Sequence, residues 1–345
     1  MELNVKQNAV HCIYIEIILP KLQEKEVFMT TLNTFTESAS ALQEYLITLA
    51  GRIGNEAVTR ADAALKDPSV IVCFGITRDV PAVIGECFGQ RPGTRYDQDK
   101  TAALLRRIGA DRVYDIDSLM QTILEEDIAL TRKRISSGKD LPLISGKCPA
   151  VVHFIENHFP QYQRLLSPAA NVRKLFVQKC TKEMQSLGYA REKLCLILVS
   201  TCILDKEDQE SGIDICLTVP ELAGMYKALF DNEKESIAAW NSISEGSCDP
   251  FEGVDQGKKR SRKMHPITEE DDSDQEFGFS TMTVSSLPAL QNLLRIAGDE
   301  IPANLLRCRG CIDGCVAGAG SVPLARDENY QANVDARIML LNTDN

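Results

Sequence analysis

The sequence predicts an α/β fold with parallel sheets, and three features indicate it. Residues 69–75 form an apolar run that ends at a glycine, which is typical of a strand buried on both faces. A second apolar run at 194–201 and a third at 213–218 have the same character. Segments with helical spacing separate these runs, and strands that alternate with helices define the α/β class.

The elements follow from local patterns along the chain. Leu42, Leu46 and Leu49 continue at helical spacing through 30–66, and Asp67-Pro68 then breaks the helix. The amphipathic segment 97–108 ends at Gly109, a good helix stop. We expect strands at 69–75, 112–116, 194–201, 213–218 and 279–284, and helices at 30–66, 81–88, 97–108, 118–135, 150–158, 167–187, 220–230 and 287–298.

Composition limits the classes of function. The formal net charge of −11 argues against nucleic-acid binding, which needs a basic face. No run of 18 apolar residues exists, so we expect no membrane span, and the segment 9–19 is a poor signal peptide. Met29 is as plausible a start as Met1. Among twelve cysteines, Cys73, Cys195 and Cys216 lie in apolar runs, which favours buried thiols, a reducing compartment and a cytoplasmic location.

Residues 232–278 differ from the rest of the chain. They hold a basic block at 258–263 and an acidic block at 269–274, with few large apolar residues. We expect a mobile, solvated loop. A targeting or docking signal is the alternative, and the sequence does not assign a role to the charged stretch 258–274.

The cysteine cluster near the end of the chain is the strongest chemical signal. Cys308, Cys311 and Cys315 fall within eight positions, and glycines follow at alternate places. Thiolates this close together need a cation or a disulfide partner, and glycines let backbone N–H groups approach sulfur. Cys148, before a predicted helix, and Cys202, at the end of a predicted strand, complete one metal centre. A reduced structural cysteine set or a zinc site is the alternative.

These segments, in this order, resemble the catalytic domain of the iron-only ([FeFe]) hydrogenases. Residues 144–150 resemble the family's T-S-C-C-P-x-W, residues 200–206 its M-P-C-x-x-K and residues 309–320 its M-A-C-x-G-G-C-x-x-G-G-G. Weaker similarities lie at 83–89, 101–117, 123–126 and 217–223. The resemblance implies a two-lobed fold of parallel sheets flanked by helices, with a cluster site between the lobes. We expect an N-terminal helical extension at 1–65 and the cluster domain at 66–345, with lobes at 66–190 and 191–345.

The resemblance also implies the cofactor and its ligands. Cys148, Cys202, Cys311 and Cys315 match the four ligands of a [4Fe–4S] cluster, and Cys315 matches the ligand that bridges to a two-iron subcluster. Cys308 is extra, either a substitute ligand or a bystander. The family's proton-path residues fall at Lys147, where the family has cysteine, and at Glu126.

Several departures concern the two-iron half alone. Ser200 and Arg309 stand where the family has methionines that enclose the two-iron subcluster, and residues 77–79 replace its A-P-A segment. The lysine that binds a cyanide ligand falls at Asp205, unless a shift of one residue brings in Lys206.

The sequence therefore predicts a divergent iron–sulfur protein with one [4Fe–4S] cluster and an impaired two-iron subsite, used for redox sensing or electron relay. An active [FeFe] hydrogenase is one alternative, so the sequence leaves open whether the protein is an enzyme, and an iron–sulfur assembly or interaction protein is the other. The expected partner is a redox carrier such as a ferredoxin, or a signalling protein.

Overall fold

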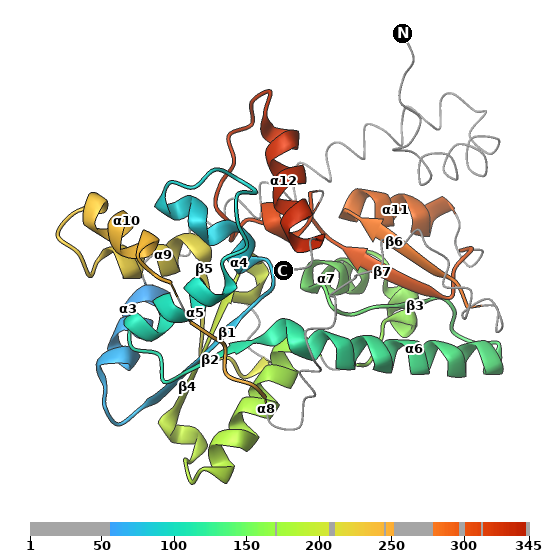
Figure 1. The fold of residues 1–345 in the computed structure, drawn as a ribbon. Helices are drawn as coiled ribbons and strands as arrows, with labels where there is room; N and C mark the ends of the chain where they lie inside the picture. Colours follow the sequence, from blue (N-terminus) through green and yellow to red (C-terminus); the bar gives the residue numbers. More distant parts are fainter. Residues whose placement is uncertain are drawn as a thin grey trace. The chain divides into compact units, whose positions relative to one another are not determined.

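Two parallel sheets organise the chain in a computed structural model, which describes residues 56–169, 171–206, 211–244, 246–251, 279–296, 301–311 and 313–342. Figure 1 shows both sheets with their covering helices. The four-stranded sheet has the order β2 (Arg112–Asp115), β1 (Ile71–Ile76), β4 (Leu194–Ser200), β5 (Ile215–Thr218). The three-stranded sheet has the order β3 (Leu143–Ile144), β7 (Leu305–Arg309), β6 (Thr281–Ser285). Every pairing is parallel, so the predicted class is confirmed.

The described helices surround these strands. They are α3 (Glu56–Lys66), α4 (Val80–Val83), α5 (Gln98–Arg107), α6 (Met120–Ser137), α7 (Pro149–His158), α8 (Val172–Ser186), α9 (Val219–Lys227), α10 (Glu233–Asn241), α11 (Leu287–Ile296) and α12 (Tyr330–Asn342). Short 3₁₀ turns include η3 (Ile84–Phe88), η4 (Ile116–Leu119), η7 (Ile203–Lys206) and η10 (Cys315–Ala317). Local chemistry sets their ends: Thr218 and Glu221 form a capping box on α9, and Gly138 ends α6 with a left-handed conformation.

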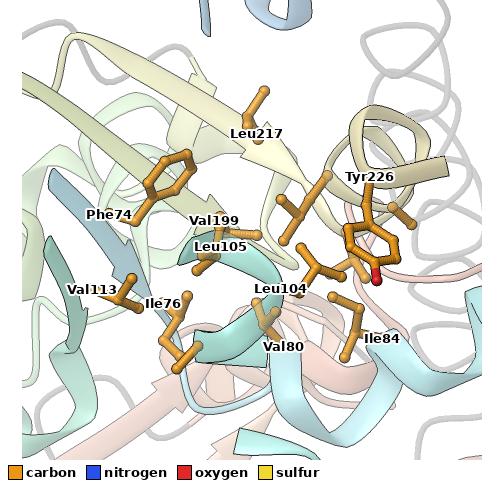
Figure 2. Packing of buried hydrophobic residues seen from close by; sticks show 14 of the residues in the cluster. Phe74, Ile76, Val80, Ile84, Leu104, Leu105, Val113, Val199, Leu217 and Tyr226 are labelled. Atoms are coloured by element: carbon orange, nitrogen blue, oxygen red, sulfur yellow. The ribbon is translucent and has the colours of Figure 1, made fainter. Parts of the chain in front are cut away.

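The four-stranded sheet is buried on both faces, as its apolar strands predict. Along β1, Phe74 joins one hydrophobic cluster, whereas its neighbour Cys73 joins the cluster on the opposite face. The alternation repeats along β4 between Ile197 and Leu198, because successive side chains point to opposite faces of a strand. Figure 2 shows the first cluster, where side chains of the sheet meet those of α4, α5 and α9. The buried cysteines predicted in these strands are confirmed by exposures of 0–8% for Cys73, Cys195 and Cys216.

Each sheet combines strands from before and after residue 190, since β1 pairs with β4 and β3 pairs with β7. The division into lobes at residue 190 stays a prediction. The cause is parallel pairing, in which a crossover can place strands distant in sequence beside each other. All described elements belong to one compact unit, Leu49–Asn345.

The segment 232–278 is not a loop throughout. Asn232 caps helix α10 by accepting a hydrogen bond from Glu235 N, and Trp240 on this helix is fully buried. The indole stacks on Phe88 with ring centroids 4.6 Å apart. A single aromatic anchor therefore folds this stretch against the core. The charged stretch 258–274 and residues 1–55, with most of the predicted helix at 30–66, lie outside the described residues.

Candidate metal centre

Cys202 follows β4 at the point where the order of the four-stranded sheet reverses. From β1 the chain proceeds to β2 on one side, and from β4 to β5 on the other. Open α/β sheets place their binding sites at the carboxyl ends of strands at such a switch point. The loop after β1 lies beside it, since Thr77 N donates to Val199 O over 3.2 Å. Cys202 N donates to Ser200 Oγ over 3.0 Å, which fixes the start of the Cys202 loop.

Cys148 lies between β3 and helix α7, which begins with Pro149. Proline suits the first position of a helix because the missing N–H would have no partner inside the helix. Gly310 N donates to Cys148 Sγ over 3.3 Å, and a Cβ at Gly310 would lie 2.7 Å from the Ala150 Cβ. Glycine therefore permits this close approach to sulfur, as its position in the sequence predicts.

Cys311 and Cys315 come from one turn, which also contacts the loop of Cys202. Gly314 has a φ of 75°, a conformation that favours glycine, and it directly precedes Cys315. Gly320 N donates to Thr201 O over 2.9 Å. A Cβ on Gly318 would lie 2.5 Å from Thr201 O, and a Cβ on Gly320 would lie 3.0 Å from it. The two backbones thus touch where only glycine leaves room.

The four thiols lie close enough to affect one another's ionisation. Burial raises the pKa of Cys202 and of Cys315 well above the ordinary value, and that of Cys311 to about 12. The other thiols of the set raise the pKa of Cys202 further, and Cys148 acts on all three. All four thiols are partly buried, and partly buried thiolates that repel one another are stabilised by a shared cation. This donor set therefore fits a group with positive metal centres.

A single metal ion and a cluster differ in how closely their cysteine ligands must approach one another. Among the described residues, no group of three or more His, Cys, Asp or Glu side chains is arranged to hold one metal ion. A zinc ion bound through sulfur at about 2.3 Å needs its ligands in contact around one point. A cubane takes each thiolate at a different corner, so its ligand sulfurs lie further apart, and four cysteines are its ordinary complement.

Cys308 lies inside β7, opposite Val284 of β6, and only 5% of its surface is exposed. Burial and then Cys148 raise its pKa to about 12. It packs as a core residue beside the candidate centre.

Lys147 and Glu126 occupy different environments. Burial, and then the nearby Arg307, lower the pKa of Lys147 to about 8. Glu126 is exposed on α6, whereas its neighbour Asp127 is 1% exposed. Asp127 accepts hydrogen bonds from Ser145 Oγ over 2.8 Å and Ser167 Oγ over 2.5 Å. No pattern in the sequence distinguishes this buried carboxylate, although its charge acts on Lys147.

Ser200 and Asp205, two residues expected at the two-iron half, are hydrogen-bonded to each other. Ser200 Oγ donates to Asp205 Oδ2 over 2.6 Å, and Arg173 Nη1 lies 2.7 Å from Asp205 Oδ1. All three side chains are buried. The adjacent Lys206 is paired with Glu221 at 2.5 Å, next to the capping box of α9. Both candidates for the cyanide-binding position are therefore held in ion pairs.

Charged side chains also lie around Cys315. Asp79 raises the pKa of Cys315, whereas Arg309 lowers it. Burial raises the pKa of Asp79 itself, and Arg309 and Arg78 oppose this increase. Asp79 and Arg309 hence stand near Cys315 where the related family has small or apolar side chains.

The fold matches solved [FeFe]-hydrogenase structures. An apo variant of [FeFe]-hydrogenase HydA1 from Chlamydomonas reinhardtii aligns with a TM-score of 0.66 and 17% identity, over 83% of this chain and 88% of that one. A structure that describes stepwise H-cluster assembly in HydA(deltaEFG) aligns with the same values. The elements thus define an α/β fold of the [FeFe]-hydrogenase class.

Sequence comparison then gives the family. The chain is 31% identical over 194 residues to the NADP-reducing hydrogenase subunit HndD of Solidesulfovibrio fructosivorans, and 28% identical over 179 residues to iron hydrogenase 1 of Clostridium pasteurianum. These alignments cover 51% and 49% of this chain, but only 33% and 31% of those proteins. Residues 70–319 match the family described as iron only hydrogenase large subunit, C-terminal domain. The chain belongs to this family, as the cysteine motifs predict. No helix among the described residues is long and apolar enough to cross a membrane.

Proposed function

We propose that the protein holds one [4Fe–4S] cluster on Cys148, Cys202, Cys311 and Cys315 and uses it for redox sensing or electron relay. Family membership and the mutual effects of the four thiols support the ligand set. A cluster of this kind supplies one-electron chemistry, and its potential depends on nearby charge and hydrogen bonds to sulfur. Here Gly310 N–H donates to Cys148 Sγ, and Asp205 is the charged group with the largest effect on Cys202.

The observation that carries the proposal is the buried network of Ser200, Asp205 and Arg173. Ser200 and, unless the alignment shifts to Lys206, Asp205 stand at positions that the resemblance assigns to the two-iron subcluster, and both side chains are hydrogen-bonded. Removal of Arg173 from Asp205 would leave a buried charge without its partner, which is costly. The network consequently supports an impaired two-iron subsite, and Asp79 beside Cys315 adds to this.

The second candidate is an active hydrogenase, and one observation favours it. Partial burial and the nearby Arg307 lower the pKa of Lys147 to about 8, and the carboxylate of Asp127 opposes this decrease. A lysine in such an environment is able to accept and release protons near pH 7. Under this hypothesis Lys147 takes the role of the family's proton-path cysteine, and a redox carrier such as a ferredoxin supplies electrons.

Infrared spectroscopy of anaerobically reconstituted protein distinguishes the two candidates. We expect four irons and four sulfides per chain, and no CO or CN stretching bands after incubation with maturation proteins and the two-iron cofactor. A double variant, Ser200→Met with Asp205→Lys, tests whether the network alone excludes the subcluster. Strong CO and CN bands together with hydrogen turnover in the unmodified protein would contradict the relay function and support an active hydrogenase. Protein that binds no iron under anoxia would remove both.

A further inference from the structure

The C-terminal helix α12 contacts the turn that carries Cys315, and one buried arginine makes most of the polar contacts. Arg337 is 0% exposed, although arginine is rarely buried without partners. Its Nη1 donates to Val316 O over 2.7 Å, and its Nη2 donates to Val322 O over 2.9 Å. These two carbonyls belong to the two ends of residues 315–322, which we name the Cys315 turn.

The charge of Arg337 is balanced from a distant part of the sequence. Its Nε donates to Glu86 Oε1 over 2.8 Å, and its Nη2 lies 2.5 Å from Glu86 Oε2, so the pair is bidentate. Glu86 lies in η3, next to α4, and α12 packs on α4 and η10. A planar guanidinium with two fixed carboxylate contacts has little freedom left. The donors that reach the Cys315 turn are therefore held in a fixed direction.

The Cys315 turn has little regular structure beyond the three residues of η10. Ser321 Oγ also donates to Val316 O over 2.7 Å, so this carbonyl accepts from two donors. At the other end of α12, Tyr330 Oη donates to Asp313 Oδ2 over 2.7 Å, between Cys311 and Cys315. The helix thus contacts the segment on both sides of Cys315.

We propose that Arg337 is a positioning residue for Cys315: it closes the Cys315 turn through two carbonyls and fixes the sulfur that the proposed cluster would use. The inference rests on the proposed function only for the role of the sulfur. The closure of the turn is a property of the chain itself, and it is testable without metal.

Three variants and a matched control test this inference. Arg337→Met removes all donors, Arg337→Lys keeps the charge, and Glu86→Gln keeps an acceptor without charge. Arg191→Met is the control, because Arg191 makes the same kind of contacts at the end of β4 opposite to Cys202, away from the four candidate ligands. Its Nη2 lies 3.0 Å from both carboxylate oxygens of Asp214, and the guanidinium also donates to Leu194 O, at the start of β4, and to Gly212 O, ahead of β5.

In the full-length apo protein we expect amide exchange in the Cys315 turn to accelerate about tenfold or more in Arg337→Met, with the four-stranded sheet unchanged. Arg191→Met should leave the turn at the unmodified rate, and Arg337→Lys should lie between. In reconstituted protein, Arg337→Met should release iron to a chelator faster, because water gains access to Cys315.

The outcomes separate this inference from the proposed function. Equal exchange in the Cys315 turn of Arg337→Met and the unmodified protein would overturn the inference. So would an iron-release rate in Arg337→Met that matches the rate in Arg191→Met. If Arg337→Met does not fold, Glu86→Gln and Arg337→Lys decide by the same two measurements. If the unmodified protein binds no iron, the proposed function is refuted. Amide exchange in the Cys315 turn of the apo protein still tests the positioning role in that case.

Discussion

Substitution of Gly318 by alanine should separate the loops of Cys315 and Cys202. A Cβ at this position would lie 2.5 Å from Thr201 O and 3.0 Å from Cys315 O, both of them backbone atoms. Ordinary van der Waals contact begins at 3.4 Å, so the two backbones must move apart by roughly 0.9 Å. Because Gly320 N donates to Thr201 O from the same turn, the hydrogen bond resists this movement.

Overpacking of this kind costs about 1–3 kcal/mol of unfolding free energy. We expect Gly318→Ala to lower the urea midpoint of the apo protein, and to reduce iron bound after reconstitution because two ligand loops no longer match one cluster. Iron and sulfide analysis under anoxia measures the second effect.

Gly224→Ala is the matched control. No atom lies within 4 Å of a Cβ at Gly224, which is inside helix α9. Alanine there should stabilise the protein by about 0.5–1 kcal/mol and leave iron content unchanged. The reasoning is wrong if Gly318→Ala binds as much iron as Gly224→Ala and unfolds at the same urea concentration.

Three further predictions concern charge and metal. Arg173→Met should lower the unfolding free energy by about 3–5 kcal/mol, because Asp205 stays buried without its partner, and a loss below about 1 kcal/mol in urea titration would contradict this. Asp97→Asn should stabilise the protein at pH 7. Burial raises the pKa of Asp97 in the folded protein above the value of 3.8 that it has in the unfolded chain, so above pH 3.8 the ionised carboxylate lowers the free energy of unfolding. That gain should disappear in unfolding curves recorded below about pH 4, and a gain equal at both pH values would exclude the cause. Removal of iron by a chelator should lower the melting temperature, with recovery on reconstitution, since a ligand of the native state alone stabilises it; an unchanged melting temperature would argue against a cluster that joins the three loops.

The sequence predicts the four-stranded sheet well because each of its strands is a continuous apolar run or a short alternating one. It fails for β7, where Arg307 and Arg309 interrupt the apolar pattern although β7 is the central strand of its sheet. It also fails for β3, which has two residues. Neither strand has a local sequence pattern typical of a strand, because each forms through hydrogen bonds to strands that are distant in the sequence.

The candidate site shows the same limit. Cysteine spacing and glycines at fixed offsets are local features, so the motifs predict the positions of the four thiols. The pairs that hold the site are not local: Arg173 meets Asp205 across 32 positions, and Arg337 meets Glu86 across 251. Charged residues of this kind look like ordinary surface positions in a sequence, and only the fold shows that they are buried.

The pairing of β3 with β7 has a consequence for biosynthesis. Leu143 aligns with Leu305, so the strand that leads to Cys148 leaves the ribosome long before its neighbour exists. Contacts between such distant residues form late because a long loop must close first. The loop of Cys148 therefore reaches its place beside Cys311 and Cys315 only after β7 has been synthesised, so a cluster that used all these thiols would be assembled after that point.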